Sequence, residues 1–94
     1  LMLITTPDNL GVYGAIDCGL YVSSFMLAAR EQGIDSIAQA ALASYPDVLR
    51  AHFGLREERK VVCGLSFGYG DEHHPVNGYR TERAELGDVV DWRD

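Results

Sequence analysis

The sequence predicts a single α+β unit in which one long and one short helix pack on a small sheet. An alternating strand pattern from Lys60 to Tyr69 and an apolar helical pattern from Ala15 to about Gln32 support this class. The chain order of strand, helix, helix, strand and tail fits one such unit, and no repeat divides residues 1–94. A hydrophobic content of 47% with 23% charged residues predicts a core rather than disorder.

The first two elements are predicted to be a buried strand and a long apolar helix. The strand is expected from Leu1 to Thr6, and its apolar run from Leu1 to Ile4 has no polar lead-in, which suggests a chain that enters in the middle of a larger fold. Turn residues from Pro7 to Gly11 close the strand, and a loop is expected to reach about Gly14. The following helix is apolar around most of its circumference, so we expect it to be buried on most sides, most simply in a subunit interface. Gly33 supplies a left-handed stop.

The middle of the chain predicts a short extended piece and a second helix. Ile34 to Tyr45 is rich in alanine and favours an extended stretch that leads into a helical turn. Pro46-Asp47 has the proline and the acid typical of a first helical turn, and Gly54 is the expected terminator. The charge run from Arg56 to Lys60 is interpreted as a solvated loop.

The strand from Lys60 to Tyr69 should have one bulky and one small face. A small face lets a helix or a ligand approach the sheet backbone closely. Gly70 to Gly78 is expected to be a polar loop, and the tail from Arg80 to Asp94 to be extended and docked. The bulky face holds Val61, Cys63, Leu65 and Phe67, and the small face holds Val62, Gly64, Ser66 and Gly68.

Composition excludes several classes of function. A net charge of −6 and a pI near 4.8 do not suit an extended nucleic-acid surface. The longest apolar stretch, Ala15 to Ala29, is shorter than the roughly 20 residues of a membrane span, and no signal peptide is visible. Cys18 and Cys63 lack the spacing of a zinc or redox site, so we expect buried thiols in a reducing cytoplasm.

Several stretches together resemble the carboxy-terminal half of the nitroreductase family. They are Gly33 to Leu42, Tyr45-Pro46-Asp47, the helix end Gly54-Leu55, the strand Val61 to Tyr69, and the tail Pro75 to Arg83. The resemblance implies the carboxy-terminal portion of a nitroreductase-like fold, in a homodimer built around the long helix. It also implies FMN in a groove between the subunits.

The resemblance places Arg80 and Arg83 on the FMN phosphate, since the family has a basic pair near its carboxy terminus. A guanidinium offers planar, permanently charged donors that suit phosphate oxygens. The alternative is that both arginines are exposed and pair with Glu82 or Glu85.

The resemblance also places backbone N–H groups of the turn Ala38-Gln39-Ala40 against the flavin ring. A donor aimed there stabilises the reduced anionic ring. This sequence has alanine where the family often has proline and glycine, and the alternative is that these alanines begin a helix.

The implied activity is the reduction of a small-molecule acceptor such as a nitroaromatic or a quinone. NADH or NADPH would reduce FMN, which passes the electrons on, so no side chain is assigned as acid, base or nucleophile. No stretch of the 94 residues matches the family's amino-terminal Arg-Arg-Ser-x-Arg type segment. The alternative function is therefore a catalytically incomplete dimerisation or flavin-binding remnant.

Two other kinds of site fit the sequence less well. Asp71, Glu72, His73 and His74 carry possible metal ligands, but adjacent histidines rarely point at one ion, so no metal is assigned. A nucleophilic Cys63 paired with His52 or His74 would need an exposed thiolate, whereas Cys63 lies on the bulky strand face.

Overall fold

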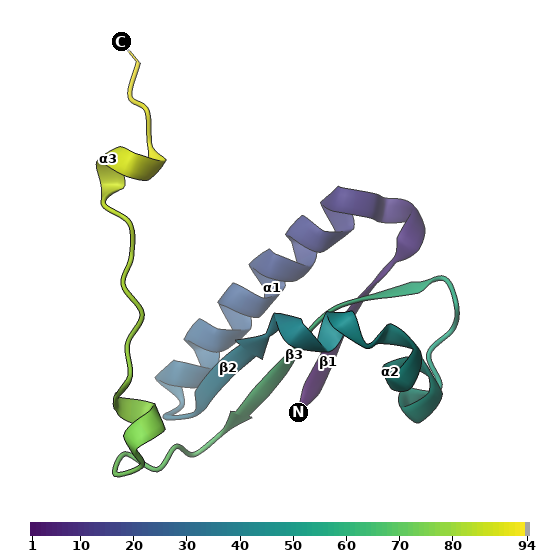
Figure 1. The fold of residues 1–94 in the computed structure, drawn as a ribbon, viewed down its shortest axis with the longest axis horizontal. Helices are drawn as coiled ribbons and strands as arrows, with labels where there is room; N and C mark the ends of the chain where they lie inside the picture. Colours follow the sequence, from purple (N-terminus) through teal and green to yellow (C-terminus); the bar gives the residue numbers. More distant parts are fainter. Residues whose placement is uncertain (94) are drawn as a thin grey trace.

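The computed structural model describes residues 1–93 and confirms the α+β class. Three strands form one antiparallel sheet in the order β1-β3-β2, with β3 in the centre (Figure 1). β1 spans Met2–Pro7, β2 spans Asp35–Gln39 and β3 spans Arg59–Gly68. The two predicted strands are therefore confirmed, and the short extended piece after Ile34 is the third.

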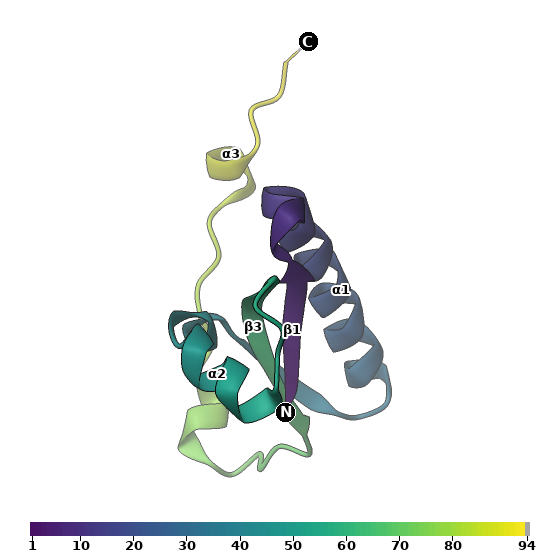
Figure 2. The same ribbon diagram turned by 90° about the vertical axis from the view of Figure 1, so that its right-hand side faces the viewer.

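Two helices lie on opposite sides of this sheet (Figure 2). The long helix α1 spans Gly11–Glu31, and the short helix α2 spans Pro46–Phe53. Gly33 and Gly54 follow them with φ angles of 73° and 63°, as the sequence predicted for left-handed stops. The remaining helical pieces are short: η1 (Asp8–Leu10), η2 (Ala40–Ser44), η3 (Pro75–Gly78) and α3 (Leu86–Val89).

The core lies between α1 and the bulky face of the sheet. Leu65 of β3 is fully buried at 0% exposure, and it clusters with Ile4 of β1 and Val22 of α1. Phe25 extends this cluster and meets Phe67 edge to face, with ring centroids 5.4 Å apart. The alternation predicted for β3 therefore sets which residues form the core.

The small face of β3 receives η2. Gly64 is buried, and a Cβ atom there would collide with Leu42 of η2. Because Gly64 has no side chain, the backbone of η2 can lie close against the sheet. The close approach that the sequence predicted for this face is made by the chain itself.

One expectation about the start of α1 and one about the two cysteines need correction. The helix begins at Gly11, where a loop was expected to reach Gly14, because its first turn packs on β1 with Gly14 beside the buried Thr6. Within this single chain the helix is buried along one stripe, since the sheet covers only one face and Leu20 and Leu27 are 64% and 72% exposed. Burial of the other sides in a subunit interface stays a prediction. Cys18 and Cys63 at the core margin are half-buried, not buried.

The helical run also exceeds the apolar stretch that the sequence suggested. Asp8–Glu31 covers 24 residues, which by length and composition alone could cross a membrane. The core helix of a soluble protein passes the same test, and the inner stripe of α1 contributes to the core described above.

The tail is extended, as predicted, and among residues 1–93 it is not docked on the rest of this chain. It leads away from the body of the molecule past α3 (Figure 1). Every residue from 69 to 89 is exposed, and the apolar side chains of Leu86, Val89 and Trp92 face solvent.

Candidate functional site

The turn Ala38-Gln39-Ala40 lies where β2 ends and η2 begins. Ala38 and Gln39 still pair with Leu65 and Gly64 of β3, and Ala40 is the first residue of η2. Ala40 therefore begins a helical turn, which is the alternative given for these alanines, whereas Ala38 still belongs to the strand. No side chain caps η2, and the first N–H groups of a helical turn have no partner within it.

Contacts on both sides fix the position of this turn. The Gln39 side chain accepts a hydrogen bond from Ser66 Oγ at 3.1 Å, and Leu42 packs over Gly64. The turn is thus held against the small face of β3 by a polar and an apolar contact.

Arg80 and Arg83 lie beyond η3 on the exposed part of the chain. Arg80 Nη1 donates to the backbone oxygens of Asn77 at 2.7 Å and Tyr79 at 2.9 Å. Arg83 Nη1 donates to Thr81 Oγ1 and to the backbone oxygen of Glu82. Among residues 1–93 neither arginine takes part in an ion pair, so the pairing with Glu82 or Glu85 that was weighed is not made.

A cleft of about 980 Å³ lies between the start of β2, the end of β3 and the loop that follows β3. Arg80 and Tyr79 from the end of the loop line this cleft together with Ile37 of β2 and Ser66 of β3. Ile37 directly precedes the predicted turn, but Ala38, Gln39 and Ala40 themselves do not line the cleft, so Arg80 is the one predicted site residue in this lining. Arg83 is not part of the lining.

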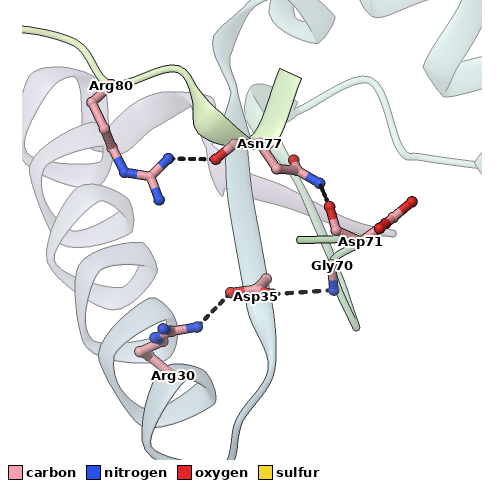
Figure 3. Close-up of polar contacts among 6 residues, drawn as sticks. All are labelled: Arg30, Asp35, Gly70, Asp71, Asn77 and Arg80. Atoms are coloured by element: carbon pink, nitrogen blue, oxygen red, sulfur yellow. Dashed lines mark hydrogen bonds and ion pairs between the residues drawn. The ribbon is translucent and has the colours of Figure 1, made fainter. Parts of the chain in front are cut away.

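Asp35 is a residue of this cleft that the sequence did not reveal. Its Oδ1 accepts from Arg30 Nη1 at 2.6 Å, and its Oδ2 accepts from the Gly70 backbone N–H at 3.1 Å (Figure 3). The carboxylate therefore joins the end of α1, the start of β2 and the loop after β3. The only sequence signal was a basic residue in the last helical turn followed five positions later by an acid.

The cleft has acids as well as bases. Arg30 and Arg80 line it together with Asp35, Asp71 and Glu72. An anionic ligand therefore meets more acidic than basic groups, and its binding depends on where the guanidinium of Arg80 points.

The polar loop after β3 uses its side chains to form turns. Asp71 Oδ1 accepts from the His73 backbone N–H at 2.9 Å, and His74 Nδ1 accepts from that of Val76 at 3.3 Å. No group of three possible metal ligands occurs among residues 1–93. The side chains of Asp71 and His74 thus accept hydrogen bonds from the nearby backbone.

Cys63 is unsuited to nucleophilic chemistry. Burial, and secondarily the neighbouring Cys18, raise the pKa of the Cys63 thiol above its ordinary value of 9.0. A thiol with a raised pKa stays protonated near neutral pH, and the thiolate is the reactive form.

Comparisons with known proteins agree with the resemblance seen in the sequence. Residues 2–69 match the model of the Nitroreductase family. Nitroreductase NfnB of Mycolicibacterium smegmatis is 42% identical over 88 residues, which are 94% of this chain and 37% of that protein. A 4-nitrobenzoate reductase of Pseudomonas putida is 33% identical over 82 residues, or 87% of this chain and 36% of its own length. The chain therefore spans little more than a third of the curated relatives it matches.

Solved structures show the same likeness in three dimensions. The FMN-dependent nitroreductase NfnB from Mycobacterium smegmatis, solved with NADPH, has a TM-score of 0.88 at 39% identity. The match covers 98% of this chain and 41% of that one. An FMN- and NADPH-dependent nitroreductase NfnB from sphigopyxis sp. strain HMH gives a TM-score of 0.92 at 32% identity, over 98% and 41% of the two chains. Since the family model covers most of its length, this chain belongs to the Nitroreductase family.

Proposed function

We propose that this chain is part of an FMN-dependent oxidoreductase that uses NADH or NADPH to reduce nitroaromatics, quinones or similar small acceptors. The observation that carries the proposal is that one cleft is lined both by Arg80, which forms no ion pair among residues 1–93, and by Ile37, which directly precedes the turn Ala38-Gln39-Ala40. Relatives named as FMN- and NADPH-dependent nitroreductases and as 4-nitrobenzoate reductases support it.

The residues present fit FMN in their chemistry. Arg80 and Arg83 donate hydrogen bonds to backbone and hydroxyl oxygens, which are weaker acceptors than a phosphate. The uncapped start of η2 leaves N–H groups of the turn for a polar ring edge. We therefore assign the phosphate to the two arginines and the ring edge to the backbone from Ala38 to Ala40.

The protein's contribution is binding and electrostatics. Bound FMN supplies hydride acceptance from the nicotinamide and electron donation to the acceptor. The turn donors stabilise negative charge on the ring, and the arginines hold the phosphate end. No side chain of this cleft needs to act as a general acid or base.

A visible absorption spectrum of the purified protein tests the proposal. We expect flavin bands, FMN released on denaturation, and oxidation of NADPH with a nitroaromatic acceptor. A protein that stays colourless after addition of FMN contradicts the proposal and favours the incomplete remnant. That alternative has less support, because the relatives compared above are named as enzymes.

We further propose a homodimer in the cytoplasm, with α1 in the interface. The exposed apolar side chains of Leu20 and Leu27 on α1 support the interface, and two free thiols support a reducing compartment. Leu20→Glu should give a monomer by light scattering, because a charge in an apolar interface is costly. Val48→Glu, at an exposed position of α2, is the control and should leave the mass unchanged. A wild-type monomer contradicts the proposal.

A further inference from the structure

We propose that Asp35 is a positioning residue for the flavin phosphate, which acts through the loop from Gly70 to Arg80 to aim the Arg80 guanidinium into the cleft. The inference rests on the proposed function, in which Arg80 contacts the phosphate. It adds a residue that touches neither the phosphate nor the ring.

The first step is the anchor at the start of the loop. Asp35 pairs with Gly68 at the end of the sheet, so Gly70 is the second residue beyond the last paired position of β3. There Asp35 Oδ2 accepts the Gly70 N–H at 3.1 Å, while Arg30 at 2.6 Å holds the other carboxylate oxygen. The loop thus leaves the sheet in a direction set by β2 and α1.

The second step is the pair of hydrogen bonds that connects the anchored start of the loop with Arg80. Asn77 Nδ2 donates to the backbone oxygen of Asp71 at 2.7 Å, which ties the far side of the loop to the residue after Gly70. The backbone oxygen of Asn77 accepts from Arg80 Nη1, also at 2.7 Å (Figure 3). Asn77 is therefore the link between the anchored end of the loop and the guanidinium.

The third step concerns energy. These contacts are exposed, and exposed polar contacts add little to the free energy of unfolding. Orientation matters more, because two arginines share the cleft with three acids. A phosphate is held only if Arg80 points at it, and a loop without its anchor spreads that side chain over many directions.

Two variants remove the anchor from opposite ends. Asp35→Ala deletes the acceptor but leaves Arg30 unpaired in the cleft. Gly70→Ala keeps every charged group of the cleft. It breaks the contact because the added Cβ would lie 2.6 Å from Asp35 Oδ2 and push the carboxylate away. Gly87→Ala is the matched control, since a Cβ there meets nothing within 4 Å. All variants are made in the protein that the complete gene encodes.

The measurement is the ratio of the dissociation constants of riboflavin and FMN, followed by flavin fluorescence. Riboflavin lacks the phosphate, so the ratio isolates the phosphate contact from binding of the ring. We expect Asp35→Ala and Gly70→Ala to weaken FMN binding about fivefold and to leave riboflavin binding and the melting temperature unchanged. In an Arg80→Gln background the same changes should have no further effect on the ratio.

The outcomes separate this inference from the proposed function. The positioning role alone is overturned if binding of FMN and of riboflavin weakens equally, or if the ratio of dissociation constants is unchanged in both variants. It is also overturned if the variants still change this ratio in the Arg80→Gln background. A wild-type protein that binds neither flavin overturns both the positioning role and the proposed function. A wild-type protein whose FMN preference survives Arg80→Gln overturns the assignment of Arg80, and the role of Asp35 with it.

Discussion

The chain has two regions whose structures are held by different kinds of interaction. Residues 1–68 contain every buried side chain of the core, and the match to the family model ends at residue 69. Residues 69–89 are exposed throughout, although they carry Tyr69, Val76 and Tyr79. The first region is held by apolar burial between α1 and the sheet, and the second by short polar contacts. Substitutions in the first should change stability, whereas those in the second should change binding.

The largest expected effect is in the core. Leu65→Ala should lower the free energy of unfolding by about 2 to 5 kcal/mol, because Leu65 is fully buried between α1 and the sheet. Leu86→Ala, at an exposed position of the tail, should change it by less than about 0.5 kcal/mol. Urea denaturation measures both. Equal losses would show that the tail is buried in the native assembly, and would remove the distinction between the two regions.

The next effect tests the small face of the sheet. Gly64→Ala should cost about 1 to 3 kcal/mol, since its Cβ collides with Leu42, and it should displace the turn before η2. Gly68→Ala on the same face meets nothing within 4 Å and is the control. Combining Gly64→Ala with Leu42→Ala should cost less than the sum of the two single changes. Strict additivity in urea denaturation would contradict the contact.

Substitutions in the second region, residues 69–89, should change the affinity for FMN. Arg80→Gln should weaken FMN binding about tenfold, because it removes a charge-assisted contact to phosphate. Arg80→Lys keeps the charge but not the planar donors, so an intermediate loss is expected. Arg83→Gln should have the smaller effect, since Arg83 lies outside the cleft lining. Fluorescence titration ranks the three variants, and a larger loss for Arg83→Gln would mean that the tail is arranged differently when FMN is bound.

Local patterns predicted most of the first region. The alternation of β3 and the stops at Gly33 and Gly54 depend on neighbours in sequence, and the structure confirms each. The contacts of Asp35 with Gly70 and of Arg59 with Thr5 join residues 35 and 54 positions apart, so no local pattern could show them. Arg59 was placed in a solvated loop, yet it begins β3 half-buried and donates to the Thr5 backbone oxygen at 2.8 Å.

The candidate site was less accessible to sequence reasoning than the core. Arg80, Arg83 and the turn Ala38-Gln39-Ala40 came from the family resemblance, because exposed arginines and alanines carry no periodic signal. The predicted docking of the tail is not made within this chain, because apolar residues such as Trp92 indicate a need for burial without showing what provides it. Sequence patterns report what a side chain requires, and the assembly decides how that requirement is met.

The smallest expected effect is a pH dependence that belongs to the first region. The pKa of Cys63 is raised in the folded state by burial and by Cys18, so folding favours the protonated thiol. That contribution to stability is fully present below the unfolded pKa and is lost as pH rises through the folded pKa, hence above about pH 9. Between pH 7 and 10 the free energy of unfolding, measured by urea denaturation, should fall more for the wild type than for Cys63→Ser, because serine does not titrate in this range. Cys18→Ser should reduce the difference only in part, because burial is the larger cause. Identical pH profiles for the wild type and Cys63→Ser would mean that the thiol is as solvated in the native protein as in the unfolded chain.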